Sequence, residues 1–407
     1  IGNARSSVAF DTIRRYFEYA GYQVNYISNF TDVDDKIIKA AKEADMTPKD
    51  LADKFIAAFM ADTQALSIKP ATQNPRVMDF MDQIIDFVQA LVDKGFAYEA
   101  GGDVYFRVQK SQNYAALANK TLADLEVGAS GRTDSETELK EDSLDFALWK
   151  SAKTDEISWD SPWGAGRPGW HIECSVMSTS ILGDTIDIHG GGADLEFPHH
   201  TNEIAQSEAK TGQTFANYWM HNGFVNVDNE KMSKSLGNFV TVHDLLKKVD
   251  GQVLRFFLAT QHYRKPINFT EKAIHDAKAN LKYLKNTYTL PLNEQADQAD
   301  LDKFLTDFKT AMDDDFNAAN GITVIFDLAK WINSGHYNQA IKDAFAKMLE
   351  VFGIVFQEES LDSDIEALIE ERQAARANKD FAKADKIRDD LAAKGIKLLD
   401  TKDGVRW

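Results

Sequence analysis

The sequence predicts an α/β fold with a parallel sheet, interrupted by an insertion and followed by helical regions. Residues 7–20 place Phe10, Ile13 and Phe17 at helical spacing, and residues 23–28 then alternate as a strand does. Helix followed by strand is the order of a parallel α/β unit, and a further strand is expected over 184–189. Beyond residue 263 the apolar spacing becomes helical, and only 8 prolines in the chain leave room for long helices.

The elements between these landmarks follow from local signals. Helices are expected over residues 36–60 and 84–94, and a hairpin with a Gly-Gly turn over 97–106. The polar stretch 126–142 indicates an insertion outside the sheet, and a strand is expected over 224–227. The C-terminal helices are expected over 273–287, 301–312, 322–332 and 340–351, then two charged helices over 363–391 and a strand over 395–400.

Composition and charge exclude several classes of protein. The 407 residues carry 46 Lys and Arg against 64 Asp and Glu, a net charge of −18 that argues against a generic polyanion binder. This length predicts two to four domains. The sequence contains no apolar run near the roughly 20 residues that span a bilayer, so no membrane partner is expected. Cys174 is the one cysteine, which excludes an intramolecular disulfide and indicates a reducing, cytoplasmic location.

The sharpest motif is the basic loop Lys231-Met232-Ser233-Lys234-Ser235, after the strand expected over 224–227. Two lysines three residues apart on a loop of small residues can surround a polyphosphate and neutralise the charge that develops during transfer. Small residues also let the loop close over a nucleotide. The alternative is an ordinary solvated basic loop, but five specified residues seldom match by chance.

A second group of residues has metal-ligand chemistry. His199 and Glu203 are four apart, on one face of a helix expected to start at Pro198, and Cys174 could add a thiolate. On spacing alone a core cysteine and a hydrogen-bonding histidine remain the simpler interpretation. The glycines at 190–192 could bring a ligand near the backbone, although taken by themselves they favour a tight turn.

Three further features remain open on sequence grounds. Residues 31–36 lack the glycine and distal glutamate of a calcium loop, so a helix cap is favoured, with Thr31 a candidate for lining a pocket. The tryptophans Trp159, Trp163 and Trp170 belong either to the core or to a stacking wall, and the core is the default expectation. From residue 372 onward, ten Lys and Arg face six Asp and Glu, a local balance of +4 that suits either a phosphate-contacting face or a solvated helix pair.

Taken together, these segments resemble the cysteinyl-tRNA synthetases, which are class I aminoacyl-tRNA synthetases. The basic loop is identical to the second class I signature, and Ile1-Gly2-Asn3 resembles the first signature, His-Ile-Gly-His, from its second residue, with Asn3 at the last His position. Residues 31–36, 169–175, 197–200 and 378–385 resemble segments of the same family. The chain therefore reads as though it starts inside a motif.

The resemblance implies a domain organisation. A split Rossmann catalytic domain is expected over 1–83 and 164–220, interrupted by an acceptor-end insertion over 84–163. A stem-contact segment, a helical bundle and a small anticodon-binding domain are expected over 221–272, 273–355 and 356–407.

The resemblance also implies site residues. In the family, zinc is held by two Cys, one His and one Glu, and Cys174, His199 and Glu203 match three of these. The other Cys and the leading His of the first signature would precede Ile1. The resemblance implies catalytic roles for Lys231, Lys234 and Asn3. It implies places in the cysteine pocket for Trp170 and Thr31. Near the nucleotide it implies Asp194, Gly2, Gly191 and, again, Lys234.

The expected activity has two steps. L-Cysteine is activated with ATP and Mg²⁺ to cysteinyl-adenylate, and the cysteinyl group then passes to the 3′ end of tRNA(Cys), in a protein expected to be monomeric. One Zn²⁺ per chain would select cysteine over serine through the thiolate. The alternatives are a ligase that joins cysteine to an amino sugar and a non-catalytic tRNA-binding relative. A zinc hydrolase is disfavoured because no H-E-x-x-H helix is present.

Overall fold

The computed structural model describes residues 1–129, 139–154, 156–232, 237–296, 299–356, 363–393, 398–401 and 404–406. The chain divides into two compact units, residues 1–355 and 356–407. Across the described ranges, we find no helix with the length and apolar character that a membrane crossing requires.

The first helix, α1 (Gly2–Tyr19), packs against a parallel strand pair, β5 (Ile186–Gly192) and β6 (Ala216–Asn222). Ala9 and Ile13 of α1 are buried with Met220 of β6. The strand expected over 184–189 is thereby confirmed within β5, and its parallel pairing agrees with the predicted α/β fold. The tight turn favoured at residues 190–192 is wrong, because β5 runs through all three glycines. A Cβ on Gly190 would lie 2.3 Å from the Phe10 ring, so close helix packing requires the glycine there.

The strand expected over residues 23–28 is wrong, because this segment makes only isolated parallel bridges. Ile27 pairs with Gln73 and Phe30 with Arg76. Between these bridges the partner segment contains Pro75, which has no N–H to donate to a ladder.

The helix expected over 36–60 is two helices, α2 (Asp35–Glu43) and α3 (Pro48–Ala65). Asp34 caps α2 by accepting from the Ile37 N–H at 2.6 Å, as the cap interpretation of residues 31–36 predicts. Thr47 caps α3 by accepting from the Asp50 N–H at 3.1 Å, and Pro48 occupies the first helical position. Proline is favoured there and disfavoured in a helix interior, so α2 must end before it.

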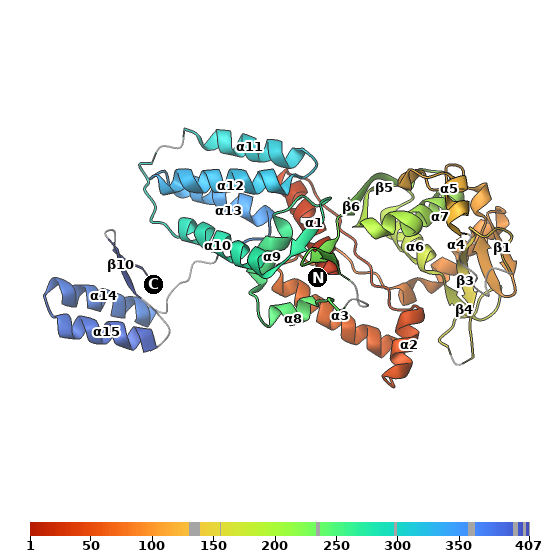
Figure 1. The fold of residues 1–407 in the computed structure, drawn as a ribbon, viewed down its shortest axis with the longest axis horizontal. Helices are drawn as coiled ribbons and strands as arrows, with labels where there is room; N and C mark the ends of the chain where they lie inside the picture. Colours follow the sequence, from red (N-terminus) through yellow and green to blue (C-terminus); the bar gives the residue numbers. More distant parts are fainter. Residues whose placement is uncertain are drawn as a thin grey trace. The chain divides into compact units, whose positions relative to one another are not determined.

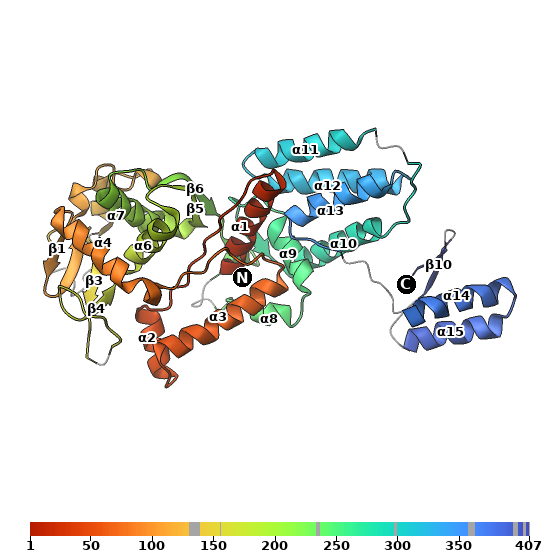
Figure 2. The same cartoon turned by 180° about the vertical axis from the view of Figure 1, so that it is seen from behind.

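Residues 97–168 contain an antiparallel sheet of strand order β1-β2-β3-β4. Gly101 and Gly102 both have positive φ, which confirms the predicted two-residue hairpin turn. Figures 1 and 2 show α4, α6 and α7 gathered beside this sheet. The elements are α4 (Met81–Asp93), β1 (Ala97–Ala100), β2 (Asp103–Phe106), α5 (Leu122–Ala129), β3 (Phe146–Ser151), β4 (Gly166–Pro168), α6 (Trp170–Leu182) and α7 (Thr201–Thr211).

A small sheet and two helices follow. In the sheet, β7 (Val225–Val227) pairs with β8 (Glu230–Lys231) in antiparallel and with β9 (Ile267–Phe269) in parallel orientation. Between β8 and β9 lie α8 (Val242–Leu246) and α9 (Gly251–Ala259). The predicted strand over 224–227 is therefore confirmed as β7.

Residues beyond β9 form the helical bundle predicted from the apolar spacing. Leu284, Phe308, Ile325, Leu328 and Phe345 are completely buried between its helices. The helices are α10 (Glu271–Tyr288), α11 (Leu301–Asp313), α12 (Ala318–Asn333) and α13 (Gln339–Val351).

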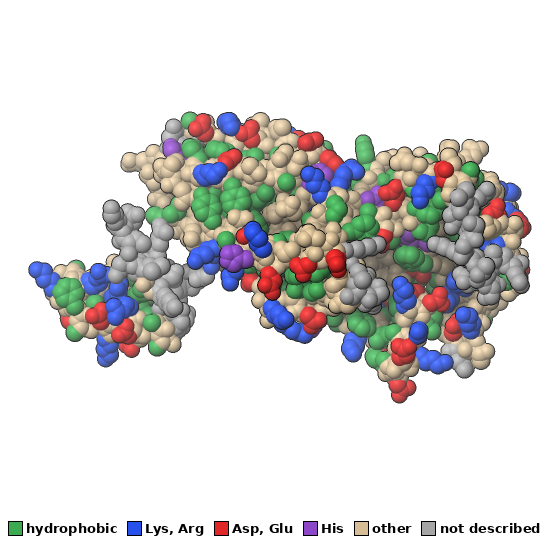
Figure 3. Space-filling model, viewed as in Figure 1, with side chains coloured by type: hydrophobic (Ala, Val, Ile, Leu, Met, Phe, Trp, Pro, Cys, Tyr) green, Lys and Arg blue, Asp and Glu red, His purple; other side chains and the backbone are tan. Residues whose placement is uncertain are grey.

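The second unit contains α14 (Ser363–Ala377), α15 (Phe381–Ala393), β10 (Leu399–Thr401) and β11 (Gly404–Arg406). Its core holds Ile369, Ile387 and Leu391. Part of the strand expected over 395–400 lies outside the described residues, and β10 covers its end. Figure 3 shows Lys and Arg side chains beside Asp and Glu side chains on one face of this unit. Lys383, for example, pairs with Glu371 at 2.7 Å.

Candidate active site

The predicted ligand residues meet where α6 packs against α7. Cys174 lies on α6, Glu203 in the first turn of α7, and His199 in the turn just before it. One ligand atom of each residue lies within 4.8 Å of the others. Ser175 of α6 donates to the Glu203 carbonyl oxygen at 3.3 Å and accepts from Gln206 of α7 at 3.0 Å. These buried hydrogen bonds hold the two helices in register.

The chemistry of this cluster fits a metal ion. Glu203 is completely buried, and its oxygens lie 3.0 Å from His199 Nε2 and 3.2 Å from His189 Nε2. Among the described residues, no N–H is aligned to donate to either carboxylate oxygen. Sulfur, imidazole nitrogen and carboxylate oxygen are the donors that Zn²⁺ takes in proteins.

The pKa shifts of Glu203 and Cys174 favour binding of a cation between them. Burial alone would raise the pKa of Glu203, but the adjacent His189 and His199 outweigh it and hold that pKa well below its usual value. Burial raises the pKa of the Cys174 thiol well above its usual value, and the carboxylates of Glu203 and Glu173 act in the same direction. A thiolate at Cys174 therefore needs a compensating positive charge nearby.

Four more histidines surround this cluster, and the sequence interpretation missed them. His189 and His200 join Glu203 in a second group whose atoms lie within 4.8 Å, and His200 Nδ1 lies 2.8 Å from Nε2 of His221. His189 lies midway along β5, and His221 lies near the carboxyl end of β6, where open α/β sheets bind ligands. The place of His221 at the end of a strand was the one feature of the sequence that could have indicated these histidines.

His171, on α6, supports the predicted ligand His199. Their Nδ1 atoms are 2.9 Å apart, so one of them donates to the other. Burial lowers the pKa of His171 to about 3, and that of His200 to about 2. Both rings are therefore neutral near pH 7, with one nitrogen left as an acceptor.

Of the predicted cysteine-pocket residues, Trp170 lies next to the cluster, and Thr31 follows two residues after Asn29, which contacts Cys174. The Trp170 and His199 ring centroids are 4.3 Å apart, with 49% of Trp170 exposed, so the prediction that Trp170 belongs to the core is wrong. Its ring lies tilted against that of a candidate ligand, and about half of the side chain stays exposed. Trp159 and Trp163 do pack against the core. Thr31 is half-buried, and two residues before it Asn29, missed in the sequence, donates to Cys174 Sγ at 3.8 Å.

The predicted nucleotide residues of β5 border the histidine group. A Cβ on Gly191 would lie 2.9 Å from His200 Cε1, so a side chain there would collide with that ring. Asp194 lies in the short turn Ala193–Leu195 that follows β5, and its Oδ1 lies 2.5 Å from where a Cβ on Gly192 would stand.

The two sequence signatures approach each other at the start of α1. Gly2 and Asn3 form its first turn, and a Cβ on Gly2 would lie 3.5 Å from Cε of Met232 in the basic loop. Lys231 ends β8, and Lys234 lies outside the described residues.

Comparison with known proteins agrees with this geometry. The family described as "tRNA synthetases class I (C) catalytic domain" matches residues 1–279, the DALR domain matches 307–357, and the cysteinyl-tRNA ligase anticodon binding domain matches 358–407. A cysteine–tRNA ligase of Streptococcus thermophilus is 79% identical over the whole chain, which covers 91% of that protein. The chain belongs to the cysteine–tRNA ligase family. A Streptococcus agalactiae member of the family is 77% identical over the same 407 residues, which again cover 91% of its length.

A solved structure extends the comparison to the fold. The methionyl-tRNA synthetase of Mycobacterium tuberculosis, in complex with methionyl-adenylate, superposes with a TM-score of 0.60 at 15% identity, covering 86% of each chain. The family, the enzyme class and the α/β fold with helical C-terminal regions predicted from the sequence are confirmed. The relatives named here give no support to an amino-sugar ligase.

Proposed function

We propose that this member of the cysteine–tRNA ligase family activates L-cysteine with ATP and Mg²⁺ and transfers it to tRNA(Cys). The observation that carries the proposal is the cluster of the half-buried Cys174 with the buried His199 and Glu203, beside the exposed ring of Trp170. Zn²⁺ held by these three residues would supply a Lewis acid that binds the substrate thiolate and binds the hydroxyl of serine poorly.

The chain's own residues divide the remaining work. The Trp170 ring lies against that of His199 and would wall the side-chain pocket, with Thr31 near the substrate amine. Asp194, Gly191, Gly2 and Lys234 would border the nucleotide, where glycines allow close approach of a ligand to the backbone.

Lys231, Lys234 and Asn3 would act on the reaction itself. A carboxylate oxygen of cysteine attacks the α-phosphorus of ATP, a P–O bond forms, and the bond to pyrophosphate breaks. The ribose hydroxyl of tRNA then attacks the cysteinyl carbonyl, and AMP leaves. The protein forms no covalent bond in either step, so the lysines contribute by neutralising charge on the phosphates and by positioning them.

Amino-acid-dependent ATP–pyrophosphate exchange tests the proposal. We expect cysteine to support exchange about 10⁴-fold better than serine, because a site built around one polar contact strongly rejects a substrate that lacks it. Charging of a tRNA(Cys) transcript should follow. Comparable exchange with serine would overturn the role of the metal cluster, and exchange without tRNA charging would favour an amino-sugar acceptor.

Replacing Asn29 with alanine is expected to weaken zinc binding about 10-fold, because an outer hydrogen bond to a metal ligand contributes to affinity. Its Nδ2 donates to Cys174 Sγ at 3.8 Å. Competition with a chromogenic chelator measures the affinity. Asn74→Ala is the matched control, since Asn74 Nδ2 donates nearby to the Ser28 carbonyl oxygen at 2.6 Å. Equal affinities for the two variants would show that Asn29 does not act on the thiolate.

A further inference from the structure

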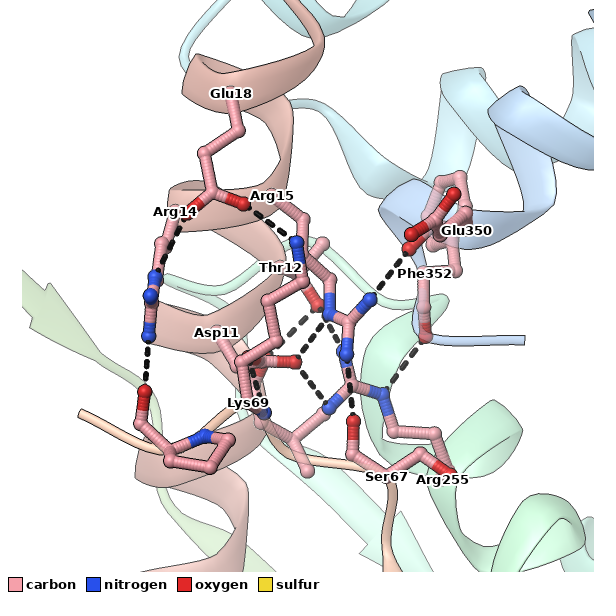
Figure 4. A network of polar contacts seen from close by, with 12 residues as sticks. Asp11, Thr12, Arg14, Arg15, Glu18, Ser67, Lys69, Arg255, Glu350 and Phe352 are labelled. Carbon is pink, nitrogen blue, oxygen red and sulfur yellow. Dashed lines mark hydrogen bonds and ion pairs between the residues drawn. The ribbon is translucent and has the colours of Figure 1, made fainter. Parts of the chain in front are cut away.

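A buried carboxylate connects α1 to α9. Asp11 Oδ2 of α1 lies 2.7 Å from an Nη1 atom of Arg255 on α9 and 2.7 Å from Nε of Arg15, one turn further along α1. The Arg255 side chain is 0% exposed and that of Asp11 is 3% exposed. Figure 4 shows both guanidinium groups converging on the one carboxylate. This ion cluster is therefore shielded from water.

Arg255 also reaches the end of the helical bundle. Its Nε donates to the carbonyl oxygen of Phe352, just after α13, at 2.7 Å, and its Nη2 donates to Thr12 Oγ1 at 3.2 Å. Gly353 follows with φ of +71°, and a Cβ there would lie 2.6 Å from Arg255 Cζ. The chain leaving α13 closes over the guanidinium so tightly that only glycine fits.

The guanidinium of Arg5 also joins α1 to α9, nearer the start of α1. Arg5, which is 1% exposed, donates to the carbonyl oxygens of Leu258 at 2.5 Å and His262 at 2.8 Å. These carbonyls lie at and after the C-terminal end of α9, where a cation is electrostatically favoured. Arg5 and Asp11 are about 9 Å apart along α1 at the usual helical rise. Helix α1 is thus fixed to α9 at two positions along its length, Arg5 and Asp11.

These two helices lead to the two signature segments. Helix α1 begins with Gly2 and Asn3, and the basic loop is followed by α8 and then α9. The Cβ position of Gly2 lies 3.5 Å from Met232 of that loop. A shift of α9 along α1 would therefore change the spacing between the two segments that the proposed function assigns to ATP.

We infer that Arg255 is a positioning residue for adenylate formation, an inference that rests on the proposed function. Its planar fork bonds a carboxylate, a hydroxyl and a carbonyl in directions that apolar packing would not define. A buried ion pair contributes little net stability over apolar packing, and setting register is the use of such pairs that is best attested. Arg255 therefore sets the register of α1, α9 and the bundle.

The experiment compares Arg255→Met with Arg15→Met in ATP–pyrophosphate exchange with cysteine. Arg15 bonds the same carboxylate, but its other nitrogens donate to the carbonyl oxygens of Ser67 and Glu350, not to α9. We expect kcat/KM for ATP to be about 100-fold lower in Arg255→Met than in Arg15→Met, because small misplacements far from the reacting atoms can lower the rate by that factor. The KM for cysteine and the zinc content should stay within about twofold of the parent protein, because the polar partners of Arg255 are Asp11, Thr12 and Phe352, which lie on α1 and after α13 rather than on the ligand helices α6 and α7.

Equal kcat/KM for ATP in the two variants would overturn the inference. A rise in the KM for cysteine as large as the fall in kcat/KM for ATP would overturn it as well. If Arg255→Met does not fold, Arg255→Lys decides, because lysine keeps the pair with Asp11 but cannot also bond Phe352 and Thr12. It should retain part of the activity, and full activity would contradict the positioning role. Absence of exchange in the parent protein would instead contradict the proposed function.

Discussion

Replacing Glu203 with alanine is expected to remove zinc binding and to lower cysteine-dependent exchange by more than about 100-fold. Outer hydrogen-bond partners of metal ligands already contribute about 10- to 100-fold to affinity, so a ligand should contribute more. Glu203 is completely buried and faces the imidazoles of His199 and His189 at 3.0 and 3.2 Å. Without its carboxylate these rings lose their shared negative partner, and the remaining donors carry too little negative charge for a dication.

Zinc content by elemental analysis and exchange kinetics measure the two effects separately. The KM for cysteine should rise while the KM for ATP changes little, since the cluster is assigned to the amino acid. Glu208→Ala is the matched control, because Glu208 lies on the same helix but is exposed and accepts from the Phe215 N–H. A Glu203→Ala protein that retains one equivalent of zinc and normal exchange would refute the ligand assignment.

Local signals were enough to predict much of the fold. The hairpin at residues 97–106, the bundle helices and the β7 strand were predicted because period and turn chemistry are properties of short segments. The break between α2 and α3 was also readable, in Thr47 followed by Pro48. The strand expected at residues 23–28 failed for a non-local reason, because its alternation is real but its partner segment contains Pro75 and cannot complete a ladder.

The candidate site was predicted only where its residues share an element or a family motif. His199 and Glu203 are one helical turn apart, so their pairing followed from spacing. His189 and His221 come from different strands and approach the cluster only because β5 and β6 pair in parallel. For Trp170 the core was favoured over a stacking wall by default, yet its position against His199 leaves almost half of it exposed. Burial of one residue depends on neighbours that a sequence pattern does not identify.

Replacing Asp11 with asparagine is expected to destabilise the larger unit by about 3–5 kcal/mol. Removing one partner of a buried ion cluster leaves the other charges uncompensated, and this costs more than the cluster contributes. Here the loss would strand two guanidiniums, those of Arg15 and Arg255, each 2.7 Å from Asp11 Oδ2. If the amide nitrogen of the new asparagine took the place of Oδ2, its N–H groups would face the two guanidinium donors, and no acceptor would be there for any of them.

The midpoint and slope of the first urea-unfolding transition measure this change. Asp307→Asn is the control, since Asp307 pairs with Lys303 at 2.7 Å on an exposed helix face and its loss should not move the midpoint measurably. The double variant Asp11→Leu/Arg255→Met should be more stable than Asp11→Leu alone, because apolar groups replace both members of a buried pair. Equal midpoints for Asp11→Asn and Asp307→Asn would show that the carboxylate does not hold the buried guanidiniums. The double variant removes the stranded charge of Arg255 but leaves that of Arg15, and it also loses the bonds to Phe352 and Thr12. It should therefore recover part of the stability without recovering exchange. That separation of stability from activity is what distinguishes a cluster that sets register from one that merely holds the fold together.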